Sequence, residues 1–402
     1  MRLPLLPLCL IPLLLFGCST VRVVPERPGT TRPGQPGEAP PLVRGERART
    51  EAFPPADSDG YRPPARVAVL LPMSGTLAAA GTSVRDGYLA GYYAEARNRP
   101  VLKFYDSHGT GSGAQAAYDK AIAEGAQMIV GPLSRDEVNA VSAQIDGSVP
   151  VITLNRGSKL PATGTTSFAL LPDEEGVAAA NRLADRNASS VVVFSNSSDS
   201  AQRAVAAFRE ALRKRGGDIV SEIAVAGEMT ELGGKLAALQ SGPTPPKAVF
   251  LAVDAGQGRT VAALLKTSAL AGLPRISTSQ ILSGASARAD IELDGIEYPE
   301  LPWLLHQGGQ LPDAAGLAKT LPSARGAAQR LFAFGADAWT LTAYFERLYE
   351  NPSYSVRGAT GVLRIDISGP VHRNTSWAVF SGGRGRASAD AGQAPDVQQP
   401  SD

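Results

Sequence analysis

Hydroxyl, amide and charged residues, with one glycine, follow several short apolar runs of this chain, where the ends of neighbouring strands would meet. They are Ser74, Gly75 and Thr76, then Ser134, then Asn155 and Arg156, then Ser195, Asn196 and Ser197, and finally Asp254. In open parallel sheets, ligands bind beyond the carboxyl ends of the strands. The set therefore predicts a cleft that could hold a small polar ligand. The alternative is that these residues form turns and cap the following helices, as Ser74 and Ser134 could.

The sequence offers no convincing catalytic set. Its three histidines, His108, His306 and His372, are far apart and lack the spacing of a metal-binding motif. The G-x-S-x-G and S-x-x-K motifs of serine acyl-transfer enzymes are absent. The acidic run Asp173–Glu175 stands at a predicted helix start, where carboxylates interact favourably with the helix dipole. We expect no enzyme activity, metal or cofactor. A glycosidase is not excluded by this reasoning, because its two opposed carboxylates have no sequence motif that could be searched for.

The N-terminus has the pattern of a lipoprotein leader. A basic start, Met1-Arg2, precedes an apolar stretch, Leu3–Phe16, and a small residue, Gly17, precedes Cys18. This pattern predicts a secretory signal peptide over residues 1–17, with cleavage before Cys18. The last four residues resemble the lipobox, which implies diacylation and N-acylation of Cys18. Three acyl chains, such as palmitate, would anchor the protein stably to a membrane outside the cytoplasm.

Composition limits what the rest of the chain can be. The only cysteines are Cys9 and Cys18, so the folded part has no thiol for a disulfide, a thiolate metal site or a cysteine nucleophile. A formal charge of +1 over 402 residues creates no overall positive electrostatic field that would attract nucleic acid. Residues 18–65 are rich in proline and arginine and poor in large apolar residues, which predicts an extended tether. Residues 383–402 are expected to be a disordered tail.

Between these segments, hydrophobic patterning indicates repeated βαβ units and hence an α/β fold. Expected strands are 67–71, 101–105, 128–130, 149–154, 190–194, 219–225, 248–252, 361–367 and 376–380. Expected helices are 79–97, 113–125, 135–144, 173–186, 200–215, 231–240, 257–267 and 324–350. The alternation of strand and helix patterns restarts near residue 173. It therefore predicts two Rossmann-like lobes, each with a parallel sheet flanked by helices.

Several segments resemble the type I periplasmic-binding-protein fold. They are Val67–Gly75 with Ala78–Gly81 and Arg85–Gly87, then Ala126–Pro132, then Val149–Thr153. The resemblance implies hinge crossovers between the lobes. We expect lobe 1 to contain about 66–165 plus 278–345, and lobe 2 about 166–277 plus 346–382.

Further segments point to one branch of that fold. They are Leu70–Gly75 with Ala80-Gly81, Val84–Tyr93, Tyr105-Asp106, Val130–Leu133 with Glu137-Val138, Val151–Asn155, Phe332–Ala338, Gly358–Asp366, Val371–Arg373 and Trp377–Phe380. Together they resemble the penicillin-binding-protein activator lipoproteins (LppC/LpoA-like). Some members carry an N-terminal helical-repeat domain, and nothing between Cys18 and Arg66 is expected to form one.

That resemblance implies a regulator, not an enzyme. It implies that the protein binds a bifunctional penicillin-binding protein and stimulates its peptidoglycan synthesis. Ser19 and Thr20, which follow Cys18, resemble the pattern of lipoproteins exported to the outer membrane. An alternative is a solute-binding lipoprotein that recognises an amino-acid-like ligand through the polar loops. A carbohydrate-active enzyme is a third hypothesis.

Overall fold

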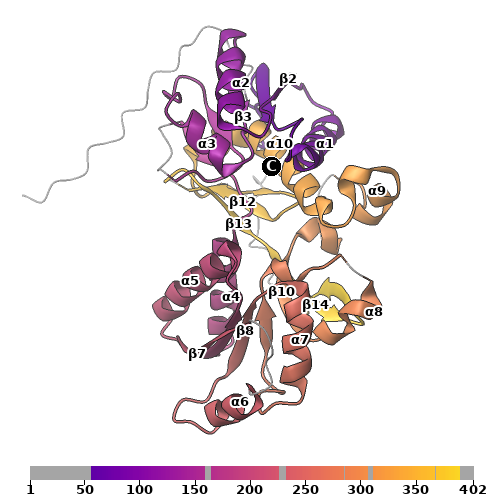
Figure 1. Cartoon of the computed structure of the whole chain (residues 1–402). Coiled ribbons are helices and arrows are strands. Elements are labelled where there is room, and N and C mark those ends of the chain that lie inside the picture. The colour runs from indigo at the N-terminus through magenta and orange to yellow at the C-terminus, as the bar shows by residue number, and fades with distance from the viewer. Residues whose placement is uncertain are drawn as a thin grey trace, which may run out of the picture. The chain divides into compact units, whose positions relative to one another are not determined.

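The computed structural model describes residues 56–158, 164–225, 232–284, 286–306, 311–366 and 368–389. The expected leader, Cys18, most of the expected tether and residues 390–402 lie outside these ranges. The described residues form two α/β lobes, as Figure 1 shows. Within the same ranges, no helix combines the length and the apolar character needed to cross a membrane.

The first lobe contains a parallel sheet that, among the described residues, has the strand order β2-β1-β3-β4-β5. Its strands are β1 (Arg66–Leu71), β2 (Val101–Asp106), β3 (Met128–Val130), β4 (Val151–Thr153) and β5 (Thr165–Ser167). Its helices are α1 (Ala78–Ala94), α2 (Gly111–Ala123), α3 (Arg135–Val141), α9 (Ala314–Thr320) and α10 (Ala328–Glu350). Alternate residues of β1 enter different cores, one shared with α1 and α10 and the other with α2 and α3. Helices thus cover both faces, which explains why β1 is apolar throughout.

Helices α1 and α10 approach each other closely because glycines lie at their contact. A Cβ atom at Gly87 would lie 1.8 Å from the carbonyl oxygen of Phe332, and one at Gly335 would lie 2.0 Å from that of Val84. Neither position has room for a side chain. The close packing fixes α10 against α1 and thereby sets the position of its buried polar residues.

The second lobe contains a mostly parallel sheet with the order β15-β14-β10-β9-β8-β6-β7 in the described part of the chain. Its strands are β6 (Ser190–Ser195), β7 (Asp218–Ala224), β8 (Ala248–Ala252), β9 (Arg275–Ser277), β10 (Ile296–Glu300), β14 (Ser376–Ser381) and β15 (Arg384–Ala387). Its helices are α4 (Pro172–Asp185), α5 (Asp199–Lys214), α6 (Leu232–Gln240), α7 (Ala255–Lys266) and α8 (Ala287–Asp290). Strand β14 runs antiparallel to both β10 and β15. Helices α4 and α5 pack on one core of this sheet, and α6 and α7 on the other.

A small antiparallel sheet, β11-β12-β13, belongs with the first lobe. Its strands are β11 (Val356–Arg357), β12 (Val362–Ile365) and β13 (Val371–Asn374). Leu363 and Val371 share a core with β1, α1 and α10. In the described chain, three crossovers therefore join the lobes: β5 to α4, β10 to the 3-10 turn Pro302–Leu305, and β13 to β14.

The expected division of the later chain between the lobes is wrong at two segments. Strand β10, expected in lobe 1, pairs with β9 and β14 of the second sheet. Residues 346–366 and 368–374, expected in lobe 2, belong with the first lobe, because Leu348, Leu363 and Val371 lie in its core. Strand β10 escapes recognition because Glu297 and Glu300 are polar and because Pro299, which lacks an N–H, is uncommon within strands.

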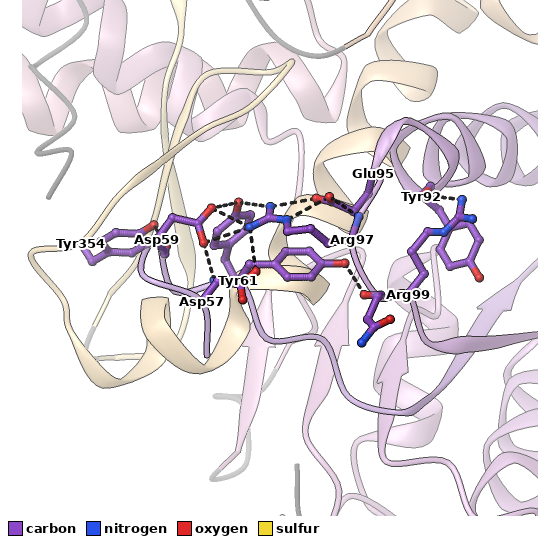
Figure 2. A network of polar contacts seen from close by, with 10 residues as sticks. Asp57, Asp59, Tyr61, Tyr92, Glu95, Arg97, Arg99 and Tyr354 are labelled. Atoms are coloured by element: carbon purple, nitrogen blue, oxygen red, sulfur yellow. Dashed lines mark hydrogen bonds and ion pairs between the residues drawn. The ribbon is translucent and has the colours of Figure 1, made fainter. Parts of the chain in front are cut away.

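The folded part begins earlier than the expected boundary at residue 66. Tyr61 is only 4% exposed and belongs to the core of the first lobe. Figure 2 shows Asp59 and Glu95 on either side of Arg97, whose guanidinium nitrogens lie 2.9 Å from an oxygen of each carboxylate. The Tyr354 hydroxyl donates to the Asp59 carbonyl oxygen at 2.7 Å. These contacts tie residues 57–61 to the end of α1 and to the region after α10.

Three other element boundaries also differ from expectation. The expected tail from residue 383 contains β15, which pairs with β14 across a turn where Gly382 and Gly383 have positive φ. Helix α10 begins at Ala328, because the 3-10 turn Pro322–Ala324 precedes it. Helix α1 ends at Ala94, and the residues that follow it contribute Glu95 and Arg97 to the network of Figure 2.

Candidate functional site

The loops after β1 and β2 meet at Ser74, Asp106 and His108. The Ser74 hydroxyl lies 2.7 Å from His108 Nδ1, and Asp106 Oδ2 lies 3.2 Å from the same nitrogen. Asp106 Oδ1 also accepts the backbone N–H groups of Met73 and His108. Partial burial would raise the Asp106 pKa, but hydrogen bonds from Ser74 and these two amides hold it below its ordinary value.

This trio does not have the geometry of a catalytic triad. A triad needs the carboxylate on one imidazole nitrogen and the nucleophile on the other. Here Ser74 and Asp106 both approach Nδ1. The neighbouring Gly75 has φ +77°, and a Cβ there would lie 2.8 Å from the His108 carbonyl oxygen, while Thr76 is exposed. The arrangement braces two loops against each other.

The loops after β3 and β4 are joined through Ser134 and Asn155. Ser134 caps α3: its hydroxyl accepts the Glu137 N–H, and the Glu137 carboxylate accepts the Ser134 N–H at 2.8 Å. Asn155 donates from Nδ2 to the Leu133 carbonyl oxygen at 3.1 Å and accepts the Arg156 N–H. A capping role for Ser134 is therefore confirmed. Ser74, in contrast, does not cap α1, whose N-cap position is Leu77.

The corresponding residues of the second lobe form a group of their own. Ser195 ends β6 and is buried. The Asn196 side chain donates to Gln257 Oε1 at 2.7 Å and accepts from Ser198. Asp254 caps α7 in a reciprocal arrangement with Gln257. These side chains thus position helix starts, and Gln257 connects two of them.

Sequence reasoning missed a set of charged residues at the crossovers. The acidic run Asp173–Glu175 does lie in the first turn of α4, as expected. Glu174, however, also pairs with Arg373 on β13 at 3.1 Å. Burial raises the Glu174 pKa, and the charges of Arg373 and Arg156 oppose that rise. The adjacent acids were visible in the sequence, but their arginine partners are distant along the chain.

A second missed residue is Asp337, which is buried within α10. Its carboxylate accepts the backbone N–H groups of Ala359 at 2.6 Å and Thr360 at 2.7 Å, and the Thr360 hydroxyl as well. Burial raises the Asp337 pKa to about 6 against the opposing effect of these hydrogen bonds. A Cβ atom at Gly358 would lie 2.5 Å from the Asp337 carboxylate oxygens, so the loop passes directly over the acid. Asp337 thereby fixes the approach to β12.

Across the residues that the structure describes, no three His, Cys, Asp or Glu side chains are grouped so that they could hold a metal ion. The other two histidines, His306 and His372, each pair with one aspartate, Asp313 and Asp366 respectively. The polar groups of the loops and crossovers therefore hold backbone and helices in place.

Comparison with known proteins decides the family. The model of the LppC lipoprotein family matches residues 60–383. This chain belongs to the LppC family. The penicillin-binding protein activator LpoA of Photobacterium profundum is 28% identical over 348 residues, which are 78% of this chain and 56% of that protein. LpoA of Haemophilus ducreyi is 25% identical over 325 residues, which are 79% and 53% of the two chains. This LppC chain thus spans about half the length of the curated relatives it matches.

Solved structures confirm the expected type I periplasmic-binding-protein-like fold. The C-domain of LpoA from Haemophilus influenzae, described as a regulator of PBP1A, has a TM-score of 0.69 at 21% identity. The match covers 80% of this chain and 99% of that domain. A branched-chain amino acid ABC transporter protein from Chromobacterium violaceum has a TM-score of 0.65 at 24% identity, covering 79% and 100%. The folded part of this LppC protein therefore has the extent of one such domain.

Proposed function

We propose that this LppC protein is a membrane-anchored periplasmic regulator that binds a bifunctional penicillin-binding protein and activates its peptidoglycan synthesis. The observation that carries the proposal is the match of the folded part to 99% of the LpoA C-domain from Haemophilus influenzae, described as a regulator of PBP1A. Membership of the LppC family over residues 60–383 supports it. The shared fold alone would not choose between docking and solute binding.

The contacts of the polar loops favour docking over solute binding. Ser134 and Asp254 cap helices, and Asn155 and Asn196 hold neighbouring loops. A ligand that used these groups would have to replace hydrogen bonds that already stabilise the fold. The loops therefore support a rigid domain that presents its outer surface to a partner.

The regulator needs no chemical step of its own. The shared approach of Ser74 and Asp106 to one nitrogen of His108 supports a bracing role for that group. Activation would act on the synthase, through tighter binding to its active form than to its inactive form. Only such a difference in affinity can shift the population toward the active form.

Anchoring places the regulator beside its partner. Acylation of Cys18 would hold the protein to a membrane, and the Ser19-Thr20 sequence after it favours export to the outer membrane. The Pro- and Arg-rich residues up to about 55 would then span toward the cell wall, with the folded lobes facing the periplasm.

The test uses the full chain, purified in detergent, with each bifunctional penicillin-binding protein of the same organism. The measurements are the rates of lipid II polymerisation and of peptide crosslinking as the regulator is titrated. We expect a saturable rate increase with one synthase. The Cys18→Ala chain is the matched control, and it should stimulate equally in detergent because the folded lobes carry the effect.

Absence of binding and of a rate change with every synthase would overturn the proposal. In that case, a thermal shift on adding an amino acid such as leucine would support the solute-binding alternative. Loss of that shift in Ser74→Ala would place the ligand at the loop that contains Ser74.

A further inference from the structure

Six charged side chains lie where the chain crosses between the lobes, and they pair acid with base. The carboxylates come from the second lobe, namely Glu174 and Glu175 on α4 and Glu300 at the end of β10. The guanidiniums come from the first lobe, namely Arg156 after β4, Arg330 on α10 and Arg373 on β13. These six residues are called the crossover clasp below. Equal numbers of acids and bases make the clasp neutral as a unit.

Glu174 connects the first crossover to the third. Its Oε2 lies 3.1 Å from Arg373 Nη2, and its Oε1 lies 3.6 Å from Arg156 Nη2. Glu174 follows the first crossover by three residues, and Arg373 precedes the third by two. The Arg373 side chain is only 3% exposed, so its charge depends on nearby carboxylates in place of water.

Glu175, the residue after Glu174 in α4, is connected to the second crossover through Arg330 and Glu300. Its two oxygens accept the backbone N–H and the hydroxyl of Ser279, at 2.8 Å and 2.6 Å. Its Oε1 also lies 3.7 Å from Arg330 Nη2, and Arg330 forms a short ion pair with Glu300. Glu300 is the residue directly before the second crossover, and its Oε1 accepts the Leu301 N–H at 2.9 Å.

A helix-dipole role alone does not account for these contacts. Such a role requires only that carboxylates lie near the first turn of the helix. Glu174 and Glu175 instead direct their oxygens to partners on β13, on α10 and at Ser279. Two adjacent residues thereby connect all three crossovers of the described chain.

We propose that the crossover clasp locks the hinge between the lobes in the absence of any ligand. In a hinge-closing domain, a ligand selects one arrangement by contacting both lobes. Here the carboxylates of the chain supply those contacts. The two lobes consequently move as one rigid body, and the surface that they present has the same shape whether or not a ligand is bound. The lock depends on the fold and not on the identity of the partner.

Hydrogen–deuterium exchange of the full chain tests the lock. The variant is Glu174→Gln with Glu175→Gln, which keeps side-chain size and removes both charges. Peptides that cover residues 168–171, 301–302 and 374–376 should exchange about tenfold faster than in the unmodified protein, since local opening there becomes more frequent. The matched control is Glu210→Gln, because Glu210 pairs with Lys214 on the exposed surface of α5. It should leave these peptides unchanged.

A distance measurement between the lobes completes the test. Ala116→Cys on α2 and Ala206→Cys on α5 place spin labels at exposed positions of the full chain, with Cys9 and Cys18 replaced by serine. We expect one narrow distance distribution without ligand and a broad one after the two Glu→Gln changes. Crossover exchange within twofold of the unmodified protein, or an unchanged narrow distribution, would overturn the proposal.

If the double variant unfolds, every peptide will exchange rapidly. Glu174→Gln alone then decides the question, and it should affect peptides 168–171 and 374–376 while distant core peptides keep their protection. Uniform protection across all peptides in that variant would contradict the lock. Neither readout contains a synthase, so this result is independent of the proposed function.

Discussion

Arg97 lies over the ring of Tyr61, with 3.8 Å between the guanidinium carbon and the ring centroid, and the Tyr61 hydroxyl donates to the Asn98 carbonyl oxygen at 2.7 Å. This pair fastens residues 57–61 to the turn after α1. Through Asp59 and Tyr344, the same network reaches α10. The buried Tyr61 ring and the ion pairs of Arg97 therefore fix residues 57–61 to the first lobe.

Truncation of Tyr61 should destabilise the whole first lobe. Tyr61→Ala removes a ring that is 4% exposed and leaves a cavity, so we expect a loss of about 3 kcal/mol in the free energy of unfolding. Denaturant unfolding followed by circular dichroism measures this. Tyr93→Ala is the matched control, since Tyr93 is 69% exposed and its loss should change stability by no more than about 0.5 kcal/mol. Equal effects of the two changes would contradict the assignment of Tyr61 to the core.

Ser134 should matter for stability and not for regulation. Ser134→Ala removes the side-chain acceptor at the start of α3, and we expect a cost of about 1 kcal/mol in the free energy of unfolding. Ser134→Asn retains an acceptor and should recover most of that loss. Synthase stimulation at saturating regulator should be unchanged in both variants. A variant of normal stability that no longer stimulates would show that Ser134 contacts a partner or ligand.

Asp337 should make stability depend on pH in a direction unusual for an aspartate. Its pKa is about 6 in the folded protein and 3.8 in the unfolded chain, so the folded state binds the proton more tightly. The resulting stabilisation is complete below pH 3.8 and is lost as pH rises through 6. Asp337→Asn loses an acceptor, which we expect to cost about 1–3 kcal/mol at low pH. The difference in the free energy of unfolding between variant and unmodified protein should narrow as pH rises from 3.8 to about 6, and stay constant at higher pH.

Asp366 supplies the control of opposite sign. Hydrogen bonds from Ser368 lower the Asp366 pKa, so its stabilisation is present above the unfolded pKa and is lost as pH falls. For Asp366→Asn, the difference in the free energy of unfolding from the unmodified protein should narrow toward low pH. Urea unfolding at several pH values measures both variants. A difference for Asp337→Asn that fails to narrow between pH 3.8 and 6 would contradict a raised Asp337 pKa in the folded protein.

Cys18 should determine where the protein is found in the cell. Cys18→Ala removes the thiol that we propose to be acylated, so the protein should move from the membrane fraction to the soluble periplasmic fraction. Cell fractionation with immunoblotting measures the distribution. Cys9→Ala is the matched control, because Cys9 lies inside the expected leader and should not affect anchoring. Membrane retention of the Cys18→Ala protein would contradict lipid anchoring at this residue.

Much of the fold could be predicted because its strands are unusually apolar. The run Ser190–Ser195 is buried at every position, and Ala248–Ala252 is as well. Such runs suit central parallel strands and are recognisable without any partner in view. Strands Thr165–Ser167 and Arg275–Ser277 were missed because they are three residues long and largely polar, although most of their residues are buried. Their burial arises from packing that local sequence does not encode.

The candidate site was only partly predictable for a related reason. Hydroxyl and amide residues at strand ends can be identified from the sequence, which also offers a capping role for Ser134 as an alternative. That the Asn196 side chain bonds to Gln257 could not be foreseen, because 61 residues separate them. The same limit hid the partners of Glu174, since Arg373 is 199 residues away.

The sequence by itself determined the α/β class, the apolar central strands and the family resemblance, because these depend on local hydrophobic order and short motifs. Only the tertiary structure decided that β10 joins the second sheet, that Tyr61 belongs to the first core, and that Glu174 meets Arg373. The physical reason is that a buried charge or a polar strand is stable only when distant groups compensate it. Those groups come together only when the chain folds.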